Sequence, residues 1–470
     1  ASLSEVKPRC DAVRATTSPF IAKVPRQGVT QWCKPELVAE VKFAQWTPGG
    51  NLRAPVFLRL RDDVAARSVR RTEIERSAKP TAASQAGGAI DEILGQLDAR
   101  RENFELTIGA DTLRLTSLDR LYWPEDKALK QPPLTKRDLL RYLTRVSPHM
   151  LRHLADRPLT MIRFPEGIGG ERFFQKHWEQ ARPGFVDTVE VFSESKGRHD
   201  AYIVCNNLPT LLWLAQVGTL EFHVWHSRTL PGADAKSDAT DFSSSIEAMQ
   251  ASILNYPDWL VFDIDPYIYS GKEKAGAEPE LNTKAFEKGK EVAFHLRELL
   301  QGVQLEPIVK TSGKTGLHVF VPIRRTIDFG TARAMCEAFG RHLMQRHPRD
   351  ITMAWSVKQR TGKIFMDYNM NVRGKTLNVA YSPRALPGAA VSMPLTWEEL
   401  EHAHPLDFRM TDCFDLLDAR GDVWRDALRD KQSVENALGD RGTGATQPQA
   451  TPRKRARAAS AARRASQTKP

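Results

Sequence analysis

Two aspartates in the segment WLVFDID, residues 259–265, have the type and spacing of metal ligands. The apolar residues before them predict a buried strand, and side chains alternate between the two faces of a strand, so Asp263 and Asp265 share one face. Two buried carboxylates side by side raise each other's pKa, and a bound cation offsets that cost. Mg²⁺ and Mn²⁺ prefer oxygen ligands, so the pair predicts a divalent-metal site.

A third aspartate stands in a similar setting. Asp367 lies in KIFMDYN, residues 363–369, which also predicts a strand. Three carboxylates can hold two metal ions about 4 Å apart, one beside the attacking oxygen and one beside the leaving group of an in-line phosphoryl transfer. A D-x-D pair alone also occurs by chance at exposed strand ends. The second aspartate strand is therefore what favours the catalytic interpretation.

The segment IVKTSGKTGLHVFVPI, residues 308–323, contains a turn suited to phosphate. A Walker-type ATPase loop has the pattern G-x-x-x-x-G-K-[ST] and leads into a helix, but Ile308 takes the place of its first glycine and an apolar strand follows. The segment therefore predicts a strand, a turn and a strand, with a merely solvated hairpin turn as the alternative. The residues suited to phosphate through backbone N–H groups or side chains are Gly313, Gly316, Ser312, Lys310, Lys314 and His318.

Composition and pattern divide the chain of 470 residues into four parts. Residues 1–70 contain short strands typical of a small β-barrel. Residues 71–102 are rich in Ala, Ser, Gly and charge and predict a linker, with a frayed helix around 88–99. Residues 103–435 mix helices with adjacent hairpin strands, which favours an α+β two-layer core over a doubly wound sheet. Residues 436–470 form a basic tail.

Helices are expected on either side of the aspartate strands. Thr135 is predicted to cap the first of them, and Thr283 to begin the second. A third helix is predicted over 331–346.

The charge of the chain indicates a nucleic-acid partner. Net charge is +11, and the tail from Arg453 to Pro470 carries seven Lys or Arg residues and no acid. Such a tail is predicted to be disordered, and it either contacts phosphates nonspecifically or is only a solvated terminus.

The compartment is predicted from cysteines and from missing signals. Five scattered cysteines without a CxxC pair predict reduced thiols and no thiol-bound zinc. No apolar run approaches the ~20 residues of a membrane helix, and no secretory signal opens the chain. We therefore expect a cytoplasmic protein without a membrane partner. The chain begins with Ala in place of Met, which predicts a piece of a longer polypeptide.

Three segments in order resemble the core motifs of a known family. WLVFDIDP, KTSGKTGLHVFVPI and KIFMDYNMNVRGKTLNVAYSPRALPG are similar to motifs of the polymerase domain of bacterial DNA ligase D, within the archaeo-eukaryotic primase superfamily. The resemblance covers about residues 110–430 and includes LTSLDRLYWPE, DRPLTMIRFPEGI, FFQK and LEFHVW. WCKPELVAEVKFAQWTPGGNLRAPVFLRLRDDV resembles the end of the oligonucleotide-binding fold of an ATP-dependent DNA ligase. The implied fold is a primase-like two-layer core with a mixed or antiparallel sheet, preceded by a partial oligonucleotide-binding unit.

The resemblance implies a polymerase of bacterial non-homologous end joining. Such an enzyme fills or extends broken DNA ends, often with ribonucleotides. The implied partners are DNA ends or gaps with a 5′-phosphate, NTP or dNTP substrates, a Ku-type end-binding protein, and a ligase core on the same longer polypeptide. The implied cofactor is Mn²⁺ or Mg²⁺ in a two-metal site.

The resemblance also implies roles for individual side chains. A lone histidine and a pair of phenylalanines are more often structural, and only the motif context favours function for them. The metal ligands would be Asp263, Asp265 and Asp367; the nucleotide-binding residues Ser312, Gly313, Lys314, His318, His223, Arg360 and Arg384; and the DNA-binding residues Phe173, Phe174 and Lys176 at the bases, with Arg120 and Lys136 at a 5′-phosphate.

Several positions depart from the family pattern. Ile162 stands where a lysine is common, which leaves that nucleotide contact missing or moved to Arg163. Met370 replaces a polar glutamine, and residues 267–279 form an extra loop. The ligase-like segment has RDDV at 61–64 and lacks the lysine of its terminal motif. No K-x-D-G motif of an adenylated lysine occurs in the chain, so this chain alone is not expected to seal nicks.

Four functional hypotheses remain. A template-dependent nucleotidyltransferase is the first, and a primase that starts chains without a primer shares its chemistry. A noncatalytic module that binds DNA ends is a rival from another class, but three separately placed aspartates and a phosphate turn argue against it. An ATPase is the weakest alternative, because the Walker pattern is broken at Ile308.

Overall fold

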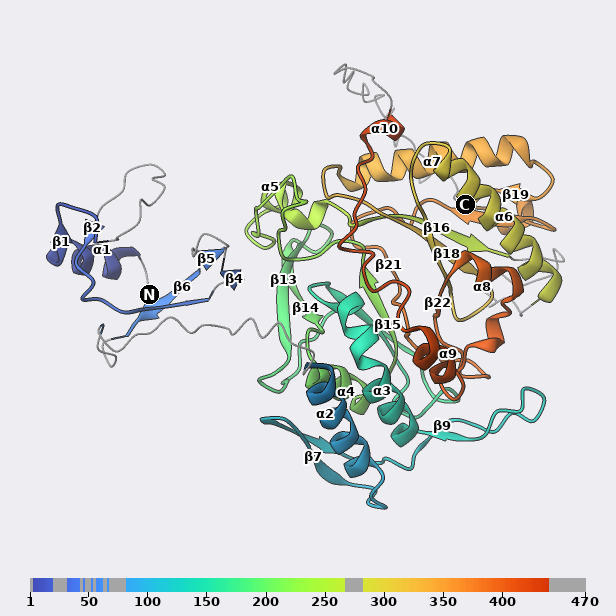
Figure 1. Cartoon of the computed structure of the whole chain (residues 1–470), viewed down its shortest axis with the longest axis horizontal. Coiled ribbons are helices and arrows are strands. Elements are labelled where there is room, and N and C mark those ends of the chain that lie inside the picture. Colours follow the sequence, from blue (N-terminus) through green and yellow to red (C-terminus); the bar gives the residue numbers. More distant parts are fainter. Residues whose placement is uncertain are drawn as a thin grey trace, which may run out of the picture.

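The computed structural model describes residues 3–19, 32–42, 45–46, 52–53, 56–61, 66, 82–266 and 282–438 (Figure 1). Three expectations from the sequence fall outside these residues: the extra loop at 267–279, the basic tail beyond 438 and the last three residues of the RDDV motif. None of the helices in the described ranges is long and apolar enough to cross a membrane.

The N-terminal part contains one helix and short antiparallel strand pairs. Helix α1 spans Leu3–Ala12. Strands β1 (Arg14–Ala15) and β2 (Trp32–Cys33) pair, as do β3 (Ala39–Lys42) with β6 (Val56–Leu60) and β4 (Gln45–Trp46) with β5 (Leu52–Arg53). Within the described residues these strands form three separate antiparallel pairs, and the small β-barrel stays a prediction.

The second half of the predicted linker is a packed helix. Helix α2 spans Ala82–Leu97, and its residues Ile93 and Leu97 are buried in the core of the following unit. Gln96 bonds both the N–H and the carbonyl of Thr107 on the next strand. The helix begins earlier than the frayed helix expected around 88–99, and it is stabilised because its apolar side packs against the core of the following unit. The domain boundaries themselves stay predictions.

A six-stranded mixed sheet forms the first layer of the main unit. Its order is β19 (Ile351–Thr352), β20 (Ile364–Asp367), β16 (Trp259–Asp265), β18 (Leu317–Pro322), β17 (Ile308–Thr311) and β22 (Pro394–Leu395). Only β19 and β20 are parallel; all other neighbours are antiparallel. This confirms the strand, turn and strand predicted over 308–323.

Two long helices cover one face of this sheet. Helices α6 (Thr283–Gln301) and α7 (Phe329–Arg346) both contact β16 and lie beside it in Figure 1. The ring of Phe262 on β16 lies 6.2 Å from that of Phe339 on α7, so the even-numbered residues of β16 face the helices. Asp263 and Asp265 therefore project to the other face.

A four-stranded antiparallel sheet forms the second sheet. Its order is β12 (Phe173–Gln175), β11 (Leu159–Arg163), β15 (Thr219–Trp225) and β21 (Thr376–Asn378). Three hairpins accompany it: β7 (Phe104–Ile108) with β8 (Asp111–Leu115), β9 (Leu121–Trp123) with β10 (Leu134–Thr135), and β13 (Asp187–Ser193) with β14 (Arg198–Val204).

The remaining helices complete the core. Helix α3 spans Lys136–Leu154 and begins with a capping box of Thr135 and Asp138, as the sequence predicts for Thr135. Asn282 caps α6, which begins at the expected Thr283. The other helices are α4 (Leu208–Gln216), α5 (Ile246–Ala251), α8 (Trp397–His402), α9 (Cys413–Arg420) and α10 (Glu435–Leu438).

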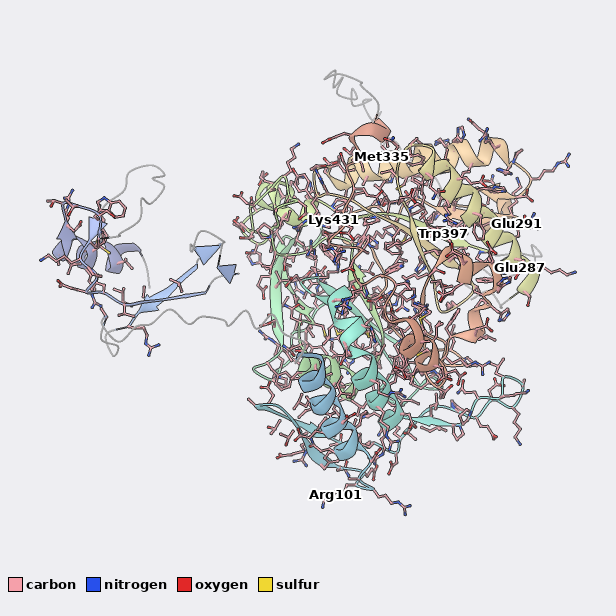
Figure 2. The ribbon with its side chains drawn as sticks, in the orientation of Figure 1. Arg101, Glu287, Glu291, Met335, Trp397 and Lys431 are labelled. Atoms are coloured by element: carbon pink, nitrogen blue, oxygen red, sulfur yellow. The ribbon has the colours of Figure 1, made fainter. Side chains whose placement is uncertain are left out.

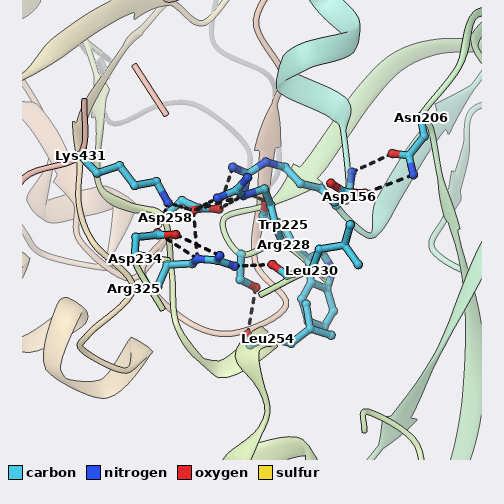
Figure 3. A network of polar contacts seen from close by, with 12 residues as sticks. Asp156, Asn206, Trp225, Arg228, Leu230, Asp234, Leu254, Asp258, Arg325 and Lys431 are labelled. Atoms are coloured by element: carbon cyan, nitrogen blue, oxygen red, sulfur yellow. Dashed lines mark hydrogen bonds and ion pairs between the residues drawn. The ribbon is translucent and has the colours of Figure 1, made fainter. Parts of the chain in front are cut away.

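A buried charge cluster anchors the beginning of β16 (Figure 3). Asp258, directly before this strand, is fully buried and accepts hydrogen bonds from Arg157 at 2.9 Å and from Arg228 at 3.1 Å. Arg325 lies 3.6 Å away, and Lys431 pairs with the same carboxylate. Burial would raise the pKa of Asp258, but the surrounding cations outweigh it and hold the pKa below its usual value.

The C-terminal segment closes this cluster. Lys431, labelled inside the domain in Figure 2, also pairs with Asp234 at 2.6 Å. The next residue, Gln432, exchanges backbone hydrogen bonds with Pro322 and Arg324 at the end of β18. The end of the described chain is thereby attached to the two strands that carry Asp263 and His318.

Candidate active site

Three aspartates and a histidine lie on one face of the mixed sheet. Asp263 on β16 is the register partner of Asp367 on β20 and, on its other side, of His318 on β18. Directly opposite residues project to the same face, and Asp265 shares that face because it is two residues further along β16. The sheet thus brings together three carboxylates that come from two separate motifs of the sequence.

Burial raises the pKa values of the three carboxylates, and repulsion among them adds to the effect. Burial, followed by repulsion from Asp265 and Asp367, holds the pKa of Asp263 well above its usual value. Burial and Asp367 raise the pKa of Asp265 to about 7, against the opposing effect of Arg360 and Lys314. Burial also raises the pKa of Asp367. Such repulsion is relieved by a cation.

The donor set fits hard divalent ions, although it is not preformed. Carboxylate oxygens are the ligands that Mg²⁺ and Mn²⁺ prefer, and the shared face supplies three of them. Across the residues that the structure describes, no three His, Cys, Asp or Glu side chains are arranged to hold a metal ion. The fit therefore rests on the chemistry and the repulsion of the donors.

The turn between β17 and β18 packs closely against its surroundings. Gly313 has φ of +72°, and a Cβ there would lie 2.7 Å from Arg384 Cγ. A Cβ on Gly316 would lie 2.6 Å from the carbonyl oxygen of Ile264. Two of the turn amides that are expected to converge on phosphate, those of residues 314 and 316, donate hydrogen bonds to Ser312 Oγ at 3.2 and 3.0 Å.

His318 is held between a lysine and an aspartate. Its Nδ1 lies 2.7 Å from Lys310 Nζ, and its Nε2 lies 3.4 Å from Asp263 Oδ1. Lys310 had been expected to add charge to the phosphate turn. The structure corrects this: Lys310 is fully buried on β17, one strand away from Asp263, and its amine contacts His318 and Ser392.

Glu221 belongs to the candidate site, although it was not predicted from the sequence. Its Oε2 lies 3.0 Å from His223 Nε2, and its Oε1 accepts a hydrogen bond from the N–H of Ala385 and lies 3.5 Å from Arg384 Nε. Burial opposes ionisation, but Arg384 and His223 outweigh it and lower the pKa of Glu221. Glu221 thus joins His223 and Arg384, two predicted nucleotide-binding residues. The sequence contained a signal for Glu221: it lies two residues before His223 on β15, so the two side chains share one face of the strand.

Arg360 is fixed beside the carboxylates. It donates to the carbonyl oxygens of Ala354 at 2.9 Å and Trp355 at 3.0 Å, and its guanidinium lies 3.4 Å from the ring centroid of Phe365. Phe365 is the register partner of Asp265. Arg360 therefore approaches the metal-ligand face from the β20 side, whereas the phosphate turn approaches it from the β18 side.

The predicted stacking residues lie at an exposed sheet edge. Phe173 is 41% exposed and Phe174 is 57% exposed, both on the edge strand β12. The ammonium of Lys176 lies 5.6 Å from the centroid of the Phe174 ring. Large exposed aromatic side chains next to a cation are the surface that single-stranded nucleic acid uses. Neither phenylalanine is a core residue.

The two predicted 5′-phosphate residues differ in exposure. Arg120 is partly exposed and pairs with Glu166 at 2.5 Å. Lys136 is buried, and its amine donates to the carbonyl oxygens of Thr116 and Gln216 at 3.1 and 3.2 Å. Burial lowers the pKa of Lys136 to about 8, with Arg120 adding to the effect. Only Arg120 presents its charge near the surface.

At one position that departs from the family pattern, the side chain belongs to the core. Ile162 is buried and pairs in register with Phe174 and Glu221. Arg163 donates to the carbonyl oxygen of Val217 at 2.7 Å and to Gln175 at 2.6 Å. Its guanidinium is therefore engaged by protein groups in this structure.

Comparisons with known proteins agree with this geometry. The chain is 29% identical over 445 residues to the multifunctional non-homologous end joining protein LigD of Pseudomonas aeruginosa, covering 93% of this chain and 46% of that protein. It is 28% identical over 322 residues to the bifunctional non-homologous end joining protein LigD of Bacillus subtilis, covering 68% of this chain and 45% of that one. The chain thus spans less than half the length of these relatives.

A solved structure and two family models give the same result. The polymerase domain of Mycobacterium tuberculosis ligase D, solved in complex with DNA, matches with a TM-score of 0.55 and 26% identity over 68% of this chain and 99% of that chain. This confirms the predicted α+β primase-like fold. Residues 1–64 match the ATP dependent DNA ligase C terminal region. Residues 135–424, more than half of the chain, match the primase-polymerase domain of LigD, and the chain belongs to that family.

Proposed function

We propose that this chain is a DNA-dependent nucleotidyltransferase that fills gaps and extends broken DNA ends in bacterial non-homologous end joining. The observation that carries the proposal is the row of Asp367, Asp263 and His318 on three neighbouring strands, beside a phosphate turn, in a chain of the LigD primase-polymerase family. Its substrates would be NTP and dNTP, with ribonucleotides used often, and DNA ends or gaps with a 5′-phosphate.

The site residues divide the chemistry among them. Asp263, Asp265 and Asp367 would hold two Mg²⁺ or Mn²⁺ ions, which when bound supply positive charge to the attacking and leaving oxygens. The primer 3′-oxygen attacks the α-phosphate, and pyrophosphate leaves. Arg384 lies next to Gly313 of the turn, so it neutralises the triphosphate and orients it through its planar fork. Ser312 and Lys314 of the same turn would contact the phosphates, and His223, which shares the carboxylate of Glu221 with Arg384, would contact the nucleotide.

The proposed contacts with DNA bases lie on the four-stranded sheet. Phe173 and Phe174 would stack on bases without selecting a sequence, and Lys176 would contact the backbone beside them. Arg120 would bind a 5′-phosphate after releasing Glu166, and Lys136 would contribute only if its amine leaves the two carbonyl groups that hold it.

The polymerase domain would act together with a ligase domain and a partner protein. We infer that residues 103–435, together with α2, form the polymerase domain, and that residues 1–70 are the end of a ligase domain on a longer polypeptide. Its relatives are about twice as long and are named as end-joining proteins, which supports this inference. A Ku-type protein is the expected partner, and the bacterial cytoplasm, on DNA, is the expected location.

The proposal is tested by primer extension on a gapped duplex with a 5′-phosphate and Mn²⁺. Wild type should add nucleotides, and Asp265→Ala should not. Asp418→Ala should behave as wild type because Asp418 is 75% exposed and lies on α9, outside the sheet that carries the three aspartates. Equal products from wild type and Asp265→Ala would remove the site assignment. Product on an unprimed template would show a primase that starts chains de novo, and DNA binding without any nucleotide addition would show a noncatalytic end-binding module.

A further inference from the structure

Lys310 has a buried amine that the proposed chemistry does not use. It is 1% exposed and lies on β17, between β18 and the edge strand β22 of the mixed sheet. Its amine lies 2.7 Å from Nδ1 of His318 and donates to Oγ of Ser392, which in turn donates to the carbonyl oxygen of Thr311. Burying a lysine amine is costly, so a sheet that retains one at this position gains something other than packing.

The contacts of Lys310 determine how the ring of His318 is oriented. The amine is a hydrogen-bond donor, so its contact with Nδ1 leaves the ring proton on Nε2. Nε2 faces Asp263 Oδ1 at 3.4 Å. Lys310, His318 and Asp263 are register partners in turn, on three neighbouring strands. The sheet therefore holds the three side chains in one row, with the ring in the middle.

We propose that Lys310 is a positioning residue that fixes the Nε2–H tautomer and the orientation of His318, so that this N–H points into the carboxylate site. The role deepens the proposed function, on which its kinetic part rests. A ring held in this way offers one donor, of known position, to an incoming phosphate oxygen or to the carboxylate. Without Lys310 the ring has no partner at Nδ1 among the contacts that the structure describes, and it would rotate or change tautomer.

A small cavity on the other side of Lys310 determines the choice of variant. It measures about 30 Å³ and is lined by Lys310, His226, Asn378 and Trp424 among others. Truncation of Lys310 to Ala would enlarge this cavity and disturb the core. Lys310→Met keeps the unbranched shape and most of the length of the side chain, and it removes the amine that donates.

The matched control is a second buried lysine. Lys290 on α6 is 6% exposed, and its amine donates to the carbonyl oxygens of Glu401 and Ala403, away from His318. Lys290→Met should lower the melting temperature without changing kcat or the nucleotide KM. It shows what the loss of a buried amine does when no site residue depends on it.

The kinetic test is a double-mutant cycle in primer extension. Lys310→Met and His318→Ala should each lower kcat/KM for the nucleotide roughly 10–100-fold, as is usual for residues that orient a ligand-binding group. The double variant should be within about threefold of His318→Ala, because Lys310 acts through the ring. Losses that multiply in the double variant, or a Lys310→Met enzyme with wild-type kinetics, would overturn the proposal.

A spectroscopic test does not depend on activity. In metal-free protein labelled with ¹⁵N-histidine, the His318 signals are identified by their loss in His318→Ala. They should show a protonated Nε2 and an accepting Nδ1 in wild type and in Lys290→Met, and a different pattern in Lys310→Met. An unchanged pattern in Lys310→Met overturns the role of Lys310 even where polymerase activity is present. A changed pattern in a chain without polymerase activity keeps that role and removes only the proposed function.

Discussion

Asp263 on β16 and Asp367 on β20 lie directly opposite each other in an antiparallel pair, although more than a hundred residues of chain separate them. Opposite residues of such a pair have their Cβ atoms about 5 Å apart, which is within the reach of a shared divalent ion. The pairing places the third carboxylate, Asp265, one pleat further on the same face. The site therefore depends on strand register more than on any single motif.

Asp265→Asn should lower the polymerase activity but raise the stability of the metal-free protein. Primer extension should fall roughly 10³-fold, because a metal ligand supplies several kcal/mol to the transition state. The melting temperature of the metal-free protein should rise, because one of three mutually repelling carboxylates is gone. Differential scanning fluorimetry with EDTA and with Mn²⁺ measures this. Mn²⁺ should stabilise wild type more than the variant, and Asp418→Asn serves as the control. Equal stabilisation by Mn²⁺ would contradict the metal-ligand role.

The metal-free protein should lose stability as pH rises through the window of this cluster. The pKa of Asp265 is about 7 in the folded chain and about 3.9 in an unfolded one. Between those values the folded state binds the extra proton, so the free energy of unfolding decreases with increasing pH and levels off above about 7. Urea denaturation at several pH values in EDTA measures the slope. Asp265→Asn should give a flatter curve, and two parallel curves would speak against the assignment.

Glu221→Gln should weaken nucleotide binding. Glu221 holds His223 and Arg384, and the neutral amide loses the charge that attracts both. Hydrogen bonds to charged groups contribute about 1.5–3 kcal/mol, so the nucleotide KM should rise roughly 10–100-fold. Steady-state primer extension measures it. Glu190→Gln, an exposed position on β13, is the control. A variant whose KM equals that of the control would leave Glu221 a purely structural residue.

Lys431→Ala should destabilise the domain. The substitution removes a partner of Asp258, which is fully buried, and of Asp234. Breaking a buried ion pair typically costs about 3–5 kcal/mol, and the other cations around Asp258 place the expected loss of unfolding free energy at the lower end. Chemical denaturation measures this loss. Arg429→Ala, in the same segment but on the surface, should leave the midpoint unchanged. Similar midpoints for both variants would show that the C-terminal segment is dispensable.

Phe174→Ala should weaken DNA binding without changing stability. The ring is 57% exposed, so its loss removes little core packing. Stacking contributes about 1–3 kcal/mol per base, so affinity for a single-stranded overhang should fall roughly 10–100-fold. Fluorescence anisotropy with a labelled overhang duplex measures the affinity. Leu230→Ala removes another large exposed apolar side chain, 43% exposed, and should bind as wild type. Unchanged affinity in Phe174→Ala would exclude stacking at this edge.

Local pattern determined much of the fold. The apolar run WLVFDID is strand β16 with the predicted limits, because a short continuous apolar run suits a buried strand. Thr135 caps α3 for an equally local reason, since Asp138 lies one turn further. The break of the Walker pattern at Ile308 was enough to exclude an ATPase loop, and β17 and β18 follow as predicted.

Tertiary structure alone decided which groups meet. Asp263 opposite Asp367, His318 opposite Asp263, and Glu221 beside Arg384 all join segments that are distant in sequence. Register between such strands is set by packing of the core, and no local pattern contains it. The same cause applies to Lys136: the family resemblance implies a contact with a 5′-phosphate, but packing buries its amine against backbone carbonyl oxygens. The sequence alone predicted most of the candidate site residues, and only the tertiary structure determined which of them lie next to one another.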